Sequence, residues 1–256
     1  MKTKDTLTKC RPLPRFLIVL VSIFFWLVLW EISSRLIGIE FIFPGAIRTF
    51  KTFFSLVIKP HFITTVLLSI FRIIIGLVLG ILFGAFAAII CIAIPALNTF
   101  ISIGMTVVRS TPVASIVMIM WIIIGSANLP VMIALLMVSP IIWQNLIDGY
   151  KNIDKSLYEV TEVFGFSRKK RFRLLILPTV KHYFIPAALT SVGLAWKSGV
   201  AAEIIAYTKN SIGQSIYDAK TFFEGDVMFA WTLAVILISV LFENAVKAIS
   251  RRVVKL

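Results

Sequence analysis

Two ionisable side chains lie inside one long apolar stretch of the chain, residues 183–207, where they could act on a charged solute. They are Lys197 and Glu203. A charge within the hydrocarbon of a membrane is costly and usually faces protein or water, so it often marks a solute path. Six residues along a helix correspond to about 240° of rotation beyond a full turn, so the two side chains lie on different faces and cannot pair with each other on it.

Lys197 and Glu203 predict different roles. An ammonium near mid-depth would favour an anionic solute, so Lys197 is a candidate residue of a translocation path. Its alternative role is to extend its ammonium toward the membrane edge or to pair with a group on another helix. Glu203 lies nearer the outer surface and would repel an anion. We therefore expect Glu203 to steady an outer gate or a contact with an external partner.

Three more polar residues are candidates for the same path: Arg109, Gln144 and Asn145. Arg109 opens the run Arg-Ser-Thr-Pro ahead of an apolar segment. The two amides lie near the inner end of the apolar stretch 131–147, and hydrogen bonding between helices is the alternative use of such amides.

Other chemistries lack the residues that they need. The two cysteines, Cys10 and Cys91, are not placed to pair, and a metal site would need more ligands. The two histidines, His61 and His182, fall at expected membrane edges. No phosphate-binding G-x-x-x-x-G-K-[ST] loop is present. We expect a non-catalytic chain with no cofactor or metal of its own, in which any ATP would be bound by another subunit.

Composition indicates an integral membrane protein. The 256 residues are 59% hydrophobic, against about 45–50% apolar in soluble domains, and the mean hydropathy is +0.97. The net charge of +14 comes from lysines and arginines at the ends of apolar stretches, where they orient helices and meet anionic lipid headgroups. This distribution argues against a nucleic-acid partner.

A polar island at residues 152–181 interrupts the apolar sequence. With Lys151 it holds eight lysines and arginines, so it should face the cytoplasm. Asp154 or Ser156 can cap a first short helix, which has an apolar face and which Gly165 should end. Ser167 can open a second, basic helix, and Pro178 should close the unit. The alternative is a basic loop that only anchors its neighbours to anionic lipid.

The island resembles the cytoplasmic coupling loop of ABC importer permeases, whose pattern is E-A-A-x3-G-x9-I-x-L-P. Four positions match: Glu159, Gly165, Leu177 and Pro178. Three depart conservatively: Val160, Thr161 and Leu175. The resemblance implies an all-α membrane protein with the type I importer permease fold. It also implies that the loop docks on a separate ATPase subunit, that the permease is a homodimer, and that a substrate-binding protein delivers the solute from outside.

A second similarity concerns the branch of the family. The run from Gly193 to Glu203 and the Arg-Ser-Thr-Pro run at Arg109 are similar to permeases for nitrate, sulfonates and taurine. This implies a small anionic solute. The branch also holds importers of pyrimidine vitamin precursors, which remain an alternative. A stand-alone secondary transporter is a further alternative, but the chain shows no internal repeat and no series of intramembrane acids.

Six spans are expected from the apolar stretches: 16–37, within 63–94, about 101–124, 131–147, 183–207 and 228–249. In the third, the residues that follow Pro112 are too few to cross the membrane by themselves. We therefore expect a helix that begins near Ile101 and kinks at that proline. A row of glycines, Gly76, Gly80 and Gly84, predicts close helix contact within the chain, and a contact face between two copies of the chain is the alternative. Six spans place both termini and the island in the cytoplasm of a prokaryotic cell.

The domain organisation follows from these spans. Residues 1–62 form a tail, a first span and an external segment. Residues 63–250 form the permease core, and residues 251–256 form a cytoplasmic tail.

Overall fold

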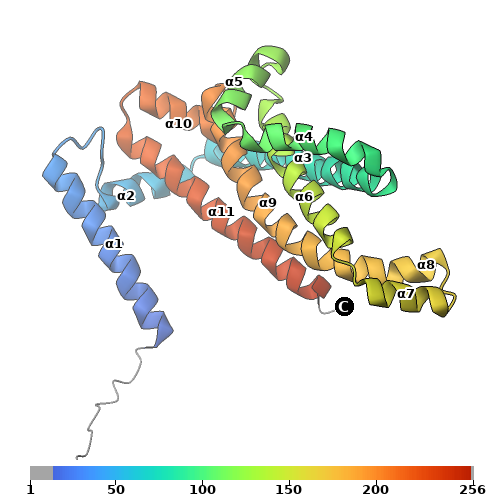
Figure 1. The fold of residues 1–256 in the computed structure, drawn as a ribbon. Helices are drawn as coiled ribbons and strands as arrows, with labels where there is room; N and C mark the ends of the chain where they lie inside the picture. Colours follow the sequence, from blue (N-terminus) through green and yellow to red (C-terminus); the bar gives the residue numbers. More distant parts are fainter. Residues whose placement is uncertain (1–13, 255–256) are drawn as a thin grey trace, which may run out of the picture.

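A computed structural model describes residues 14–254, and all regular structure in that range is helical (Figure 1). Residues 1–13, which include Cys10 and most of the predicted N-terminal tail, and residues 255–256 of the predicted C-terminal tail lie outside the described residues. The helices are α1 (Arg15–Ile37), α2 (Ala46–Val57), α3 (Pro60–Ala93), α4 (Pro95–Ser110), α5 (Val113–Ile124), α6 (Leu129–Lys151), α7 (Lys155–Val163), α8 (Arg168–Arg171), α9 (Leu177–Ile205), α10 (Ile212–Thr221) and α11 (Gly225–Val254). A π turn, η1 (Phe172–Ile176), joins α8 to α9.

The core is built on α3, α6 and α9, which pack along one another in the centre of the molecule. The glycine row on α3 faces α6, as predicted for contact within the chain. A methyl group added at Gly76 would lie 2.5 Å from the carbonyl oxygen of Val131, and one at Gly80 would lie 2.8 Å from Cβ of Val138. Only glycine lets the two helix backbones approach this closely.

The predicted number of six spans is not confirmed. Among the described residues, four helices are long and apolar enough to cross a membrane, or five if α4 and α5 form one span. The four are α1, α3, α6 and α11. Although α9 has 29 residues, it falls outside this set. It carries Lys197 and Glu203 and packs against other helices, so it does not need a continuously apolar surface.

The third span is broken rather than kinked. The expectation of one helix from about Ile101 with a kink at Pro112 is wrong: α4 begins at Pro95, ends at Ser110 and meets α5 at an angle of 106°. Thr111 is extended, with φ −79° and ψ 133°. The ring of a proline disfavours the α-helical backbone conformation at the residue before it, and proline itself has no N–H to donate to the helix. Helix α4 therefore ends before Pro112.

Helix α1 diverges from the bundle, and within residues 14–254 its hydrogen bonds and ring contacts with later segments of the chain come from its C-terminal half (Figure 1). There Ser34 donates its hydroxyl to the carbonyl of Phe43 at 2.7 Å, and Trp30 donates to the carbonyl of Pro44 at 3.1 Å. Helix α2, which follows, packs against α11. Thr52 on α2 donates to the carboxylate of Asp226 on α11 at 3.1 Å, which holds the two helices together.

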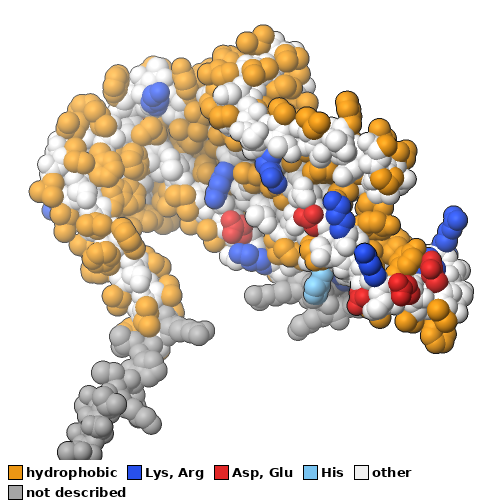
Figure 2. All heavy atoms as spheres, viewed as in Figure 1, with side chains coloured by type: hydrophobic (Ala, Val, Ile, Leu, Met, Phe, Trp, Pro, Cys, Tyr) orange, Lys and Arg blue, Asp and Glu red, His pale blue; other side chains and the backbone are white. Residues whose placement is uncertain are grey.

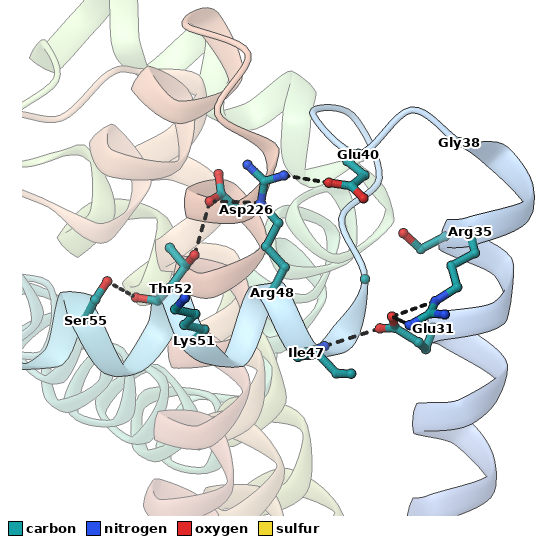
Figure 3. Close-up of a pocket in the computed structure, with 12 residues that line it drawn as sticks. Glu31, Arg35, Gly38, Glu40, Ile47, Arg48, Lys51, Thr52, Ser55 and Asp226 are labelled. Atoms are coloured by element: carbon teal, nitrogen blue, oxygen red, sulfur yellow. Dashed lines mark hydrogen bonds and ion pairs between the residues drawn. The ribbon is translucent and has the colours of Figure 1, made fainter.

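A cavity of about 810 Å³ lies between the end of α1 and α2 (Figure 3). Five of the charged side chains that line it form ion pairs. The guanidinium of Arg48 is 2.8 Å from the carboxylate of Glu40 and 3.5 Å from that of Asp226, and Arg35 is 3.1 Å from Glu31. The two pairs of Arg48 tie α2 to α11 and to the loop that follows α1, whereas the pair of Arg35 and Glu31 lies within α1. The carboxylate of Glu31 also accepts from the N–H of Ile47 at 3.3 Å, which joins α1 to α2.

Candidate functional site

The polar island forms a helical hairpin, α7 and α8, which projects beyond the ends of α6 and α9 (Figure 1). Asp154 is the residue that caps α7: its carboxylate accepts from the backbone N–H of Ser156 at 2.8 Å and from the Ser156 hydroxyl at 2.7 Å. These two donors hold the pKa of the Asp154 carboxyl below its usual value. Ser167 caps α8, as predicted, by accepting from the backbone N–H of Lys170.

Gly165 forms the corner between the two helices. Its φ of 62° lies in the left-handed region, which glycine enters without a steric cost. The N–H of Gly165 donates to the carbonyl of Glu162 and that of Phe166 to the carbonyl of Thr161, both at 2.9 Å. This pair of bonds is a Schellman motif, which satisfies two of the carbonyls left free at the end of α7. The prediction of a glycine corner is confirmed.

Arg171 clamps α8 against α7. Its guanidinium lies over the ring of Tyr158, 4.5 Å from the centroid. One of its nitrogens donates to the Tyr158 hydroxyl at 2.8 Å and lies 3.5 Å from the carboxylate of Glu162. The cation–π contact and the hydrogen bond to the same side chain together fix the position and the orientation of the guanidinium relative to Tyr158. The hairpin is therefore a stiff unit.

The hairpin leaves its apolar face uncovered. Val163 is 85% exposed and Phe164 is 73% exposed. Leu157 and Val160 continue the same face at 51% and 47%, and Glu159 is also exposed. Single exposed apolar residues are normal, but several gathered on one face of a short, charged element are typical of a docking surface.

Pro178 does not close the unit, contrary to the sequence-based prediction. The backbone stays helical from α8 through η1 into α9, and both Leu177 and Pro178 lie in the first turn of α9. Proline removes a donor and crowds the carbonyl four residues before it. The π turn immediately before it supplies the adjustment: the N–H of Leu177 donates to the carbonyl of Phe172, five residues back. The hairpin is thus joined directly to α9.

Lys197 lies on the open side of α9 in a groove of about 420 Å³ between α9 and α11, which we call the α9–α11 groove. Trp196, its neighbour, is buried and donates to the carbonyl of Val235 on α11 at 3.1 Å. Successive helix residues are about 100° apart, so anchoring Trp196 turns Lys197 out into the groove. Glu243 and Lys247 of α11 line it too, with an oxygen and a nitrogen 3.5 Å apart.

The other candidates are divided between two places. Arg109 and Gln144 line one narrow crevice between α4 and α6, and the amide of Gln144 donates to both carboxylate oxygens of Asp148 at 2.9 and 3.1 Å. Asn145 donates to the carbonyl of Ile141 on its own helix. The structure therefore brings Arg109 and Gln144 together but leaves Lys197 in a different groove.

Glu203 is completely buried. One of its carboxylate oxygens accepts from the hydroxyl of Ser69 at 2.9 Å and from the backbone N–H of Gly213 at 3.2 Å. Ser69 in turn accepts from the N–H of Ile212 at 2.9 Å. The acid thus joins α3 and α9 to the first turn of α10.

Two residues of the α9–α11 groove were not foreseen from the sequence. Glu243 and Lys247 stand four residues apart in the last apolar stretch, and that spacing places two side chains on one face of a helix. An oppositely charged pair inside an apolar stretch was the available signal.

The sequence is similar to known permeases over most of its length. It is 22% identical over 232 residues to the putative aliphatic sulfonates transport permease SsuC of Bacillus subtilis, covering 90% of this chain and 83% of that one. It is 26% identical over 186 residues to the taurine transport system permease TauC of Escherichia coli, covering 72% and 67%. With the nitrate import permease NrtB of Synechococcus elongatus the identity is 25%, covering 80% and 76%.

Solved structures share the fold. An amino acid ABC transporter chain superposes with a TM-score of 0.64 at 16% identity, covering 78% of this chain and 98% of that chain. A bacterial transporter chain for import of the polysaccharide alginate gives a TM-score of 0.61 at 16% identity, covering 93% and 94%. Residues 80–255 match the family model described as the inner membrane component of binding-protein-dependent transport systems. The chain therefore belongs to this family of ABC importer permeases.

Proposed function

We propose that the chain is the membrane-spanning subunit of an ATP-driven importer and that the α7–α8 hairpin is where a separate ATPase subunit docks. The observation that carries the proposal is the hairpin's exposed apolar face on a stiff frame, centred on Val163 and Phe164. A protein partner that covers this face would remove apolar surface from water, which is favourable at about 25 cal/mol per Å². Because η1 joins the hairpin to α9 without a loop, movement of the docked partner would reach the core.

Orientation follows from charge. The hairpin's lysines and arginines would keep it on the cytoplasmic side, where ATP is present, and both chain termini would then lie on that side. The outer ends of α9 and α11, with α10, would face a substrate-binding protein.

The solute in this proposal is a small anion such as a sulfonate, taurine or nitrate. The relatives named for these solutes support it, and so does the exposed ammonium of Lys197 within α9. A charged group in a membrane span needs protein or water beside it. A second copy of the chain beside α9 and α11 would enclose the groove in an aqueous path, so the working permease is a dimer.

The proposed cycle is a population shift. ATP would draw two ATPase subunits together, and the docked hairpins would move with them and change which side of the membrane the path faces. ATP must then bind one conformation more tightly than the other, because moving a two-state equilibrium from 1:99 to 99:1 takes about 5.5 kcal/mol of differential binding.

The test replaces one exposed phenylalanine at the hairpin and another far from it. Phe164→Asp should abolish copurification of the ATPase and ATP-dependent uptake, because a carboxylate would have to be buried without a partner at the contact. The matched control is Phe222→Asp, at a residue of similar exposure (72% against 73%) next to α10. Phe222→Asp should keep the ATPase bound.

The competing function is a transporter that works alone. It would be supported if the purified chain in liposomes took up the solute with an ion gradient and without the ATPase. Full ATPase binding by Phe164→Asp would show that the hairpin is not the docking surface.

A further inference from the structure

The α9–α11 groove gathers polar and charged groups along two helices. Lys197, Gly193 and Thr190 of α9 face Glu243 and Lys247 of α11. The charged side chains keep substantial exposure: 39% for Glu243 and 52% for Lys247. Charged side chains of both signs are visible on the face of the molecule that carries α9 and α11 (Figure 2). Such groups are not stable against lipid tails, so the groove must be wet or covered by protein.

The groove is shaped around the carboxylate. A methyl group added at Gly193 would lie 3.3 Å from Oε1 of Glu243, close enough to crowd it. The other carboxylate oxygen, Oε2, is 3.5 Å from the ammonium of Lys247. This pair is long for a charge-assisted hydrogen bond, for which about 2.7–2.9 Å is usual. The carboxylate thus pairs with Lys247 at the long end of the range for an ion pair, and its side chain is 39% exposed.

We propose that the α9–α11 groove is a binding station for the oxyanion group of the transported solute, in which Lys197 and Lys247 bind the anion and Glu243 is the counter-ion that it displaces. This rests on the proposed function. Two ammonium groups and one carboxylate leave one net positive charge, which a single sulfonate or nitrate neutralises. The volume of about 420 Å³ is within the range of small-molecule sites, about 300–1,000 Å³.

Glu243 gives the station a way to release its solute. An anion held by two lysines with no competitor would leave slowly, and a path must bind weakly enough to let its cargo go. When the carboxylate returns to Lys247 it replaces the departing anion. The predicted signature is opposite in sign for the two kinds of residue: loss of either lysine weakens anion binding, and neutralisation of Glu243 strengthens it.

The experiment uses the permease with its ATPase in nanodiscs, without the binding protein, and measures equilibrium binding of three probes: taurine, ethanesulfonate and nitrate. Lys197→Met and Lys247→Met should each weaken binding of the bound probe about tenfold or more, as expected for losing a hydrogen bond to a charged group. Lys197→Arg should restore most of it. Glu243→Gln should bind more tightly and, in proteoliposomes with binding protein and ATP, should transport more slowly.

The matched control is Lys59→Met, an exposed lysine at the start of α3, which should leave binding unchanged. Unchanged probe binding in both groove lysine variants would overturn the station, as would a wild-type complex that keeps its ATPase and binds none of the three probes. Glu243→Gln that binds more weakly would overturn the counter-ion role. Failure of the wild-type chain to retain any ATPase is a different result and contradicts the proposed function.

Discussion

Ser69 on α3 donates its hydroxyl to the carboxylate of Glu203 on α9 at 2.9 Å, although the two residues are 134 positions apart. Ser69→Ala removes this donor and leaves the N–H of Ile212 without its acceptor. An unsatisfied buried polar group costs about 1–3 kcal/mol, so the variant should unfold at a lower temperature in detergent. Ser102→Ala is the control, because the Ser102 hydroxyl is exposed and bonds only to its own helix. Equal melting temperatures for the two variants would contradict a structural role for the Ser69–Glu203 bond.

The contact between α3 and α6 gives a second prediction. In Gly76→Ala the new methyl would lie 2.5 Å from a backbone oxygen and 2.6 Å from Cβ of Ala134, so the helices must separate. Gly104→Ala is the matched control, since a methyl there has nothing within 4 Å. Both changes gain the same helix propensity, about 1 kcal/mol. Melting curves should show a lower transition for Gly76→Ala and an equal or higher one for Gly104→Ala, and the reverse order would show that the glycine row is not a packing face.

The hairpin and most helices could be predicted from the sequence because their signals are local. Asp154, Ser167 and Gly165 act on neighbours within a few residues, and apolar runs fix where helices lie. A capping group and a left-handed glycine need no knowledge of the tertiary structure.

The parts that sequence reasoning missed depend on contacts between distant segments or on competition between local rules. Pro178 predicts the end of a helix, yet the π turn before it allows the helix to continue. Pro112 predicts a disturbance but not the 106° bend. The groups that bond to Glu203 and the charged residues that share a groove with Lys197 lie on other helices. Which groups these are follows only from how the helices pack.

Gly165 carries a third prediction, on coupling. A side chain with a branched Cβ is strongly disfavoured at φ 62°, so Gly165→Val should distort the corner and the apolar face beside it. Gly165→Asn should be tolerated, because asparagine enters the left-handed region more readily. The expected result for Gly165→Val is ATP hydrolysis with strongly reduced uptake, measured as solute transported per ATP hydrolysed in proteoliposomes. An unchanged ratio for Gly165→Val would exclude the corner from transmission.

The cap of α7 predicts a pH dependence at Asp154. Because hydrogen bonds from Ser156 lower the pKa of this carboxyl in the folded hairpin, its ionised form stabilises α7. That stabilisation is complete above the ordinary aspartate pKa of about 3.9 and is lost as the pH falls through the lower, folded value. Amide hydrogen exchange of α7, corrected for intrinsic rates, should therefore show constant protection between about pH 6 and 8 and weaker protection in acid.

Two variants at Asp154 distinguish the loss of this helix cap from unfolding of the whole protein in acid. Asparagine is an equally good cap that does not titrate in this range, so Asp154→Asn should keep protection in α7 with a weaker fall in acid. Asp154→Ala has no acceptor and should lose protection at every pH. If Asp154→Ala kept full protection at neutral pH, the hydrogen bonds to Ser156 would not be what starts the helix, and tertiary contacts of the buried Thr161 would have to hold α7 in place instead.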